Sequence, residues 1–94
     1  MDEIRIDRAT AHRLVEEGAR LIDVRTPEEH AGGALAGAVN VPVQVIGQQI
    51  GEHAQKEETI VLYCKSGARS DMAARLLRSL GYVNAFNMGG IHEW

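Results

Sequence analysis

The feature that most constrains the fold is a short apolar run, Thr59-Ile60-Val61-Leu62-Tyr63, which leads directly into a polar loop and then a helix pattern. An apolar run without alternation is typical of a strand buried on both faces of a sheet. Residues 70–80 repeat apolar side chains at helical spacing, and Gly81 suits the end of a helix. The predicted inward face of this helix consists of Met72, Ala73, Leu76, Leu77 and Leu80.

Four other segments favour strands. Residues 4–6 predict a short edge strand, and residues 21–24 form a second nearly continuous apolar run. Residues 39–41 predict a brief strand and residues 84–88 the last one. Together with residues 59–63, they indicate a sheet of about five strands.

Helix patterns separate these strands along the chain. The first helix begins after Asp7 or Thr10, either of which can cap it, and the second begins after Thr26, where a proline and two acids follow. Residues 43–50 favour a third helix, and a short helical piece follows Gly89-Gly90 at the end of the chain. This alternation predicts one α/β domain over residues 1–94, with a small parallel sheet in a three-layer α/β/α arrangement.

Composition excludes several classes of function. The net charge is −3 and the charges are interspersed, so no nucleic-acid partner is expected. No run of 18 apolar residues is present, which argues against a membrane span within this chain, and the acidic start lacks the pattern of a secretion signal. A single cysteine cannot form an internal disulfide, which favours a reducing compartment such as the cytoplasm.

The loop after the buried strand carries the candidate chemistry. It reads Cys64-Lys65-Ser66-Gly67-Ala68-Arg69, and Ser70 is expected to open and cap the next helix. Backbone N–H groups at such a strand-to-helix turn, together with the helix dipole, attract negative charge. Gly67 permits the tight turn, and Lys65 and Arg69 add positive charge. A thiol in this field ionises readily and is a candidate nucleophile, an interpretation we favour over an unreactive buried cysteine.

The sequence resembles the single-domain rhodanese family of sulfurtransferases. The resemblance is carried, in the order in which the family has them, by Leu21-Ile22-Asp23-Val24-Arg25 with Pro27-Glu28-Glu29, Gly37-Ala38-Val39-Asn40-Val41-Pro42, the loop from Cys64 to Ser70, and Gly89-Gly90-Ile91 with Trp94. Two departures occur. Ala34-Leu35-Ala36 replaces the usual His-Ile-Pro, and the sequence stops at Trp94, where members usually continue for several residues.

The resemblance implies a mechanism. The Cys64 thiolate would take the outer sulfur of a donor such as thiosulfate or a low-molecular-weight persulfide, and a thiol or cyanide would then accept that sulfur. The loop amides would stabilise the negative charge, Lys65 and Arg69 would attract the donor, and Ser70 would donate a hydrogen bond to the sulfur. A persulfide carried by a partner protein is a further possible donor.

Other polar residues are expected to support this site. On the implied topology Asp23 and Arg25 end the neighbouring strand, and we expect Arg25 to pair with an acid such as Glu29. The four histidines (12, 30, 53 and 92) lack the spacing of metal ligands, so neither a metal nor a cofactor is expected. Met72 and Trp94 are expected in the core.

Two other functions compete with sulfur transfer. Related phosphatases and arsenate reductases use Cys-x5-Arg, whereas four residues separate Cys64 from Arg69 here, and the shorter loop favours a single sulfur over a tetrahedral oxyanion. A rhodanese-like binding or regulatory module without turnover is the second alternative. Such modules often lack the cysteine that this chain keeps.

Overall fold

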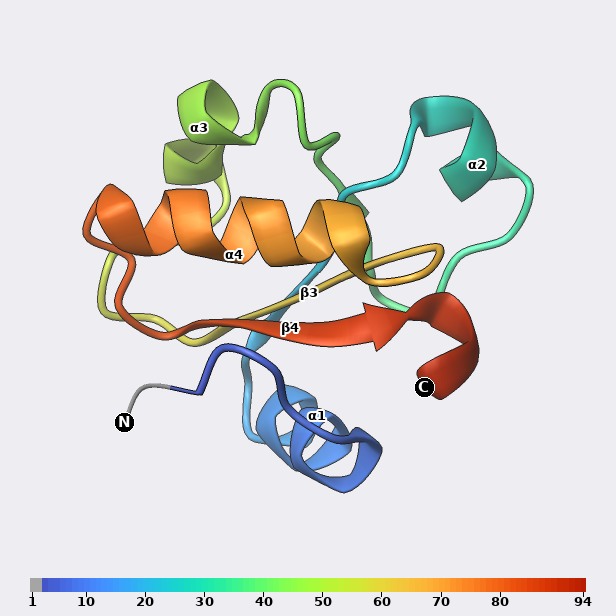
Figure 1. The fold of residues 1–94 in the computed structure, drawn as a ribbon, viewed down its shortest axis with the longest axis horizontal. Helices are drawn as coiled ribbons and strands as arrows, with labels where there is room; N and C mark the ends of the chain where they lie inside the picture. Colours follow the sequence, from blue (N-terminus) through green and yellow to red (C-terminus); the bar gives the residue numbers. More distant parts are fainter. Residues whose placement is uncertain (1–2) are drawn as a thin grey trace.

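A four-stranded parallel sheet forms the centre of the computed structural model, which describes residues 3–94 (Figure 1). The strands lie in the order β2-β1-β3-β4, and every neighbouring pair is parallel. Their bounds are β1 (Arg20–Asp23), β2 (Val39–Asn40), β3 (Ile60–Cys64) and β4 (Ala85–Gly90). The predicted parallel α/β sheet is therefore confirmed, with β3 inside it.

Helices cover both faces of the sheet. Figure 1 shows α3 and α4 on one face and α1 on the other, which gives the three predicted layers. The same picture places α2 and the β3–α4 loop at one end of the sheet, toward which the β4 arrow points. The helical bounds are α1 (Arg8–Glu16), α2 (Pro27–Ala31), α3 (Ile46–Gln49) and α4 (Ala68–Ser79), with 3-10 turns η1 (Ile50–Glu52) and η2 (Ile91–Glu93).

The β3 side chains alternate between two apolar cores, and all five are buried. Leu62 and Cys64 join the core that includes Leu77 of α4, whereas Val61 and Tyr63 join the core on the α1 side. Trp94, predicted in the core, is only partly buried and packs against this second core from outside. The apolar sequence run thus reflects burial on both faces.

The expected fifth strand is reduced to a single isolated β-bridge. Residues 4–6 do not form a strand; only Arg5 makes an isolated parallel bridge, to Asn87 of β4. The Ile6 N–H donates to Asn87 O at 3.0 Å, and the Asn87 N–H donates to Ile4 O at 2.8 Å. The prediction of about five strands was therefore one too many, because this segment leaves β4 after two hydrogen bonds and α1 begins at Arg8.

Helix α4 differs from its prediction in its start and its buried face. It begins at Ala68 after Gly67, so Ser70 lies in the first turn and is not the cap.

The buried α4 residues are Ser70, Ala73, Ala74 and Leu77. Met72 is 60% exposed, so its assignment to the core was wrong, and Leu76 and Leu80 are each 41% exposed. Ala73, Ala74 and Leu77 thus pack in the apolar core that α4 shares with the sheet, whereas the exposed apolar side chains of the helix lie outside it.

Two helix starts follow the sequence closely. Asp7, rather than Thr10, caps α1, because its Oδ1 accepts the Thr10 N–H at 2.9 Å. Thr26 caps α2 in a reciprocal capping box with Glu29.

Within residues 3–94, the structure contains no helix that is long and apolar enough to span a membrane. Residues 1–2 of the predicted 1–94 domain, and of its acidic start, lie outside the described part.

Candidate active site

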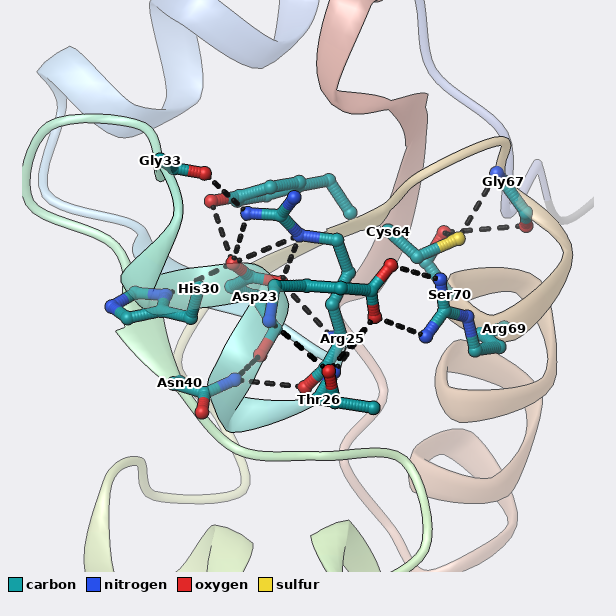
Figure 2. A network of polar contacts seen from close by, with 12 residues as sticks. Asp23, Arg25, Thr26, His30, Gly33, Asn40, Cys64, Gly67, Arg69 and Ser70 are labelled. Carbon is teal, nitrogen blue, oxygen red and sulfur yellow. Dashed lines mark hydrogen bonds and ion pairs between the residues drawn. The ribbon is translucent and has the colours of Figure 1, made fainter.

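Cys64 is the last residue of β3, and its sulfur faces the first turn of α4 (Figure 2). The Gly67 N–H donates to Cys64 Sγ at 3.0 Å, and the Ser70 hydroxyl lies 3.4 Å from the same atom. The cysteine is 1% exposed. The cradle therefore consists of a three-residue loop, Lys65 to Gly67, and the N-terminus of a 12-residue helix.

Glycines on two elements allow this loop to close. Gly67 has φ +104°, and a Cβ added there would lie 3.3 Å from Gly89 Cα. A Cβ on Gly90 would lie 2.4 Å from Lys65 O, closer than a real Cβ can approach. The Gly89-Gly90 pair and Gly67 thus belong to one packing contact between the loop and the end of β4.

The surroundings of Cys64 favour its thiolate. Burial by itself raises the pKa of the thiol, but hydrogen bonds from the Ser70 hydroxyl and from the N–H groups of Ser70, Gly67 and Ser66 outweigh it, so the pKa lies below its ordinary value. The N-terminus of α4 acts in the same direction. These surroundings favour ionisation of the Cys64 thiol, and its role as a nucleophile stays a prediction.

Asp23 and Arg25 form a buried ion pair, with exposed fractions of 0% and 7%. Arg25 Nε lies 3.0 Å from Asp23 Oδ1, and Arg25 Nη2 lies 2.8 Å from Asp23 Oδ2 and 2.7 Å from Gly33 O. Burial raises the pKa of Asp23, but the hydrogen bonds from Arg25 prevail and lower it. The expected pairing of Arg25 with Glu29 is therefore wrong, because Asp23 at the end of β1 already satisfies the guanidinium.

Three residues that the sequence did not assign to the site extend this network (Figure 2). The Tyr63 hydroxyl donates to Asp23 Oδ2 at 3.1 Å and accepts the Leu35 N–H at 3.0 Å. His30 Nδ1 lies 2.9 Å from the same carboxylate oxygen. Asn40 Nδ2 donates to Asp23 O at 3.0 Å and to Arg25 O at 2.9 Å. These contacts fasten the loop after β1 to the sheet.

Glu29 pairs instead with Arg69 in the first turn of α4. The two guanidinium nitrogens donate to Glu29 Oε1 at 2.8 Å and to Oε2 at 3.1 Å. The hydrogen bond from Arg69, assisted by the Thr26 N–H, lowers the pKa of Glu29 to about 2. Glu29 is the main cause that raises the pKa of Arg69. The negative charge of Cys64 makes a smaller contribution in the same direction. The positive charge of Arg69 is therefore largely matched within the protein.

The remaining loop residues lie at the surface. Lys65, Ser66 and Ala68 are exposed, and Lys65 forms no ion pair with any residue that the structure describes. No group of three or more potential metal ligands occurs within residues 3–94. Of the two loop cations, Lys65 thus offers its charge directly to solvent.

Asn87 was also not predicted as part of the site. It is 4% exposed on β4, and its Oδ1 lies 2.6 Å from Ser70 Oγ. An asparagine in an apolar strand carries no signal of function in a single sequence. The sequence also did not predict that its partner, Ser70, lies inside the first helical turn, because the predicted helix began two residues too late.

Comparisons with known proteins agree on one family. A family model described as a rhodanese-like domain matches residues 7–94. The thiosulfate:glutathione sulfurtransferase of Homo sapiens is 38% identical over 95 residues, with 86% of this chain and 83% of the relative covered. The Bacillus subtilis protein YqhL is 39% identical over 77 residues, covering 81% of this chain, which spans only 60% of that relative. The solved human single-domain sulfurtransferase TSTD1 has a TM-score of 0.83 at 32% identity, covering 100% of this chain and 95% of that one.

Proposed function

The chain belongs to the rhodanese-like family, and on this premise we propose that it is a sulfurtransferase that carries sulfur as a persulfide on Cys64. The donor is thiosulfate or a low-molecular-weight persulfide, and the acceptor is a thiol, or cyanide in an assay. Residues 1–94 act as one rhodanese-like domain. The lone free cysteine suits a reducing compartment, for which we propose the cytoplasm.

The first half-reaction transfers the outer sulfur of thiosulfate. The Cys64 thiolate attacks that sulfur, a new S–S bond forms on Cys64, and the bond to the sulfonate sulfur breaks. Sulfite leaves with the electron pair of the broken bond, so no general acid is required. In the second half-reaction, an acceptor thiolate attacks the outer persulfide sulfur and restores the Cys64 thiolate.

The single observation that carries this proposal is the donation of the Gly67 N–H to Cys64 Sγ at 3.0 Å, at the start of α4. The same amide can hold negative charge on the thiolate before transfer and on the persulfide after it. Lys65 supplies positive charge for an anionic donor, Arg69 adds a guanidinium that Glu29 already pairs, and Asp23, Arg25 and Glu29 hold the scaffold around the loop.

A non-catalytic binding module remains the second candidate, because Cys64 is 1% exposed. Attack requires the donor sulfur to reach Sγ between the exposed side chains of the loop. A module that only docks a partner would not need such access. The two functions differ in whether the protein acquires a labile sulfur.

The experiment is to incubate the protein with thiosulfate and measure its intact mass. We expect one added sulfur atom, which cyanide removes, and no gain in the matched variant Cys64→Ser. No labile sulfur on the wild type, or an equal gain in the variant, would exclude sulfur transfer through Cys64. Turnover of an aryl phosphate without persulfide formation would instead support the related phosphatase activity.

A further inference from the structure

The side chain of Asn87 makes three hydrogen bonds at the back of the Cys64 cradle. Its Oδ1 accepts from the Ser70 hydroxyl at 2.6 Å and from the Gly89 N–H at 2.8 Å. Its Nδ2 donates to Gly67 O at 3.2 Å. Asn87 thus contacts two of the residues that hydrogen-bond to the sulfur, Gly67 and Ser70, although no contact joins it to the sulfur itself.

The backbone partners determine which way the Asn87 amide points. The Gly89 N–H can only donate and Gly67 O can only accept, so Oδ1 must face Gly89 and Nδ2 must face Gly67. Oδ1 is therefore also the atom that faces Ser70. Two acceptor oxygens 2.6 Å apart require a proton between them, and only Ser70 can supply it.

Ser70 has one hydroxyl proton and three acceptors within reach. These are Asn87 Oδ1 at 2.6 Å, Gly67 O at 3.2 Å and Cys64 Sγ at 3.4 Å. The contact to Asn87 is the shortest, whereas a thiolate has the advantage of its charge. The Ser70 proton is therefore divided between a nearby neutral oxygen and a more distant charged sulfur.

We infer that Asn87 is a positioning residue that competes with Cys64 for the Ser70 proton and thereby restrains the reactivity of the thiolate. The relevance of Asn87 to catalysis rests on the proposed function, because Cys64 acts as a nucleophile only in that mechanism. The competition itself is a property of the folded chain and needs no sulfur donor. Ser70 thus contributes less to thiolate stability while Asn87 is present than it does without it.

The test is a double-mutant cycle on thiol reactivity, because Cys64 is the only cysteine in the chain. Iodoacetamide alkylation is measured at about pH 6 and at about pH 10 in the wild type, Asn87→Ala, Ser70→Ala and the double variant. The ratio of the two rates reports the thiolate fraction and cancels changes in access to the sulfur. Lys65 and the Glu29–Arg69 pair are the same in all four proteins.

We expect Ser70→Ala to lower this ratio less than about threefold in the wild type, and roughly tenfold in the Asn87→Ala background. If Asn87 merely supports the loop, its removal changes the ratio but leaves the effect of Ser70→Ala the same in both backgrounds, and this result would overturn the inference.

Circular dichroism shows whether Asn87→Ala folds. If it does not, Asn87→Ser takes its place, because a serine hydroxyl there can reach the Gly89 N–H but is too short to reach Ser70. The same comparison of the Ser70→Ala effect then decides the matter. A protein that gains no persulfide from thiosulfate can still show this coupling, so the two proposals fail separately.

Discussion

The Arg69 guanidinium holds both carboxylate oxygens of Glu29, at 2.8 and 3.1 Å, beside the candidate nucleophile. The pair joins the capping box of α2 to the first turn of α4, so it links two segments that are 40 residues apart. It also supplies a negative charge near a site proposed to receive anions. A donor such as thiosulfate therefore meets an Arg69 that already has a counter-ion.

Replacing Glu29 should change the preference for donors. Glu29→Gln can still complete the capping box, but it removes the charge and releases the Arg69 donors. We expect kcat/KM for thiosulfate to rise roughly threefold, and by less for a donor of lower charge. Glu28→Gln is the matched control, since it removes the same charge without touching Arg69. Equal effects of the two substitutions would show that the ion pair does not set this preference.

The same pair predicts how stability depends on pH. The pKa of Glu29 in the folded protein is lowered from 4.5 to about 2, so folding favours its ionised form. Its contribution is complete above pH 4.5 and is lost as the pH falls toward 2. The melting temperature should therefore fall less for Glu29→Gln than for the wild type over this range. An equal fall of the melting temperature with pH in the two proteins would contradict this prediction, since the other carboxylates are common to both.

The buried pair of Asp23 and Arg25 should contribute more to stability than the partly exposed pair of Glu29 and Arg69. Arg25→Ala leaves a carboxylate that is 0% exposed without its main partner, which typically costs about 3–5 kcal/mol. Urea unfolding measures this loss. Adding Asp23→Asn to Arg25→Ala should recover part of it, because no buried charge then remains. A double variant as unstable as the sum of the two single variants would argue against this explanation.

The sequence predicted best what depends on neighbouring residues. The buried run of β3, the Thr26 cap and the tight turn at Gly67 all follow from local patterns, and the structure confirms each of them. The place of Cys64 after a buried strand and before a helix is also local, although the cysteine ends the strand and does not begin the loop.

The sequence predicted least well which charges meet. The sequence paired Arg25 with an acid such as Glu29 and assigned Arg69 to the donor, but the actual pairing depends on how the end of β1 and the turn of α2 are oriented in space. Arg25 therefore pairs with Asp23, two residues away, whereas Glu29 crosses to Arg69. Asn87 illustrates the same limit, because only the β3–β4 pairing brings its side chain to Ser70.

The corrected orientation of α4 can be tested by two substitutions on this helix. Leu77 is 0% exposed in the core and Met72 is 60% exposed, although the sequence pattern placed both on one inward face. Leu77→Ala should lower the free energy of unfolding by about 2–5 kcal/mol. Met72→Ala should change it by less than about 0.5 kcal/mol. Comparable losses in denaturant unfolding would show that the helix is rotated from this orientation.

The packing of the loop on β4 leads to the last prediction, which concerns Gly90. Its φ of −87° is open to alanine, so only contact opposes a side chain there. An added Cβ would meet Lys65 O at 2.4 Å and Ser66 Cα at 3.2 Å, and these backbone atoms cannot rotate away. Gly90→Ala should therefore move the loop and lower the free energy of unfolding by about 1–3 kcal/mol.

Displacement of the loop by Gly90→Ala should also weaken the hydrogen bond from the Gly67 N–H to Cys64 Sγ. The ratio of alkylation rates at low and high pH should then fall, since the thiolate loses a donor. Gly32→Ala is the control, because a Cβ there meets only ordinary contacts at 3.5 Å or more and its φ of −77° is helical. If Gly90→Ala were as stable and as reactive as this control, the glycine pair would not be what shapes the cradle around the sulfur.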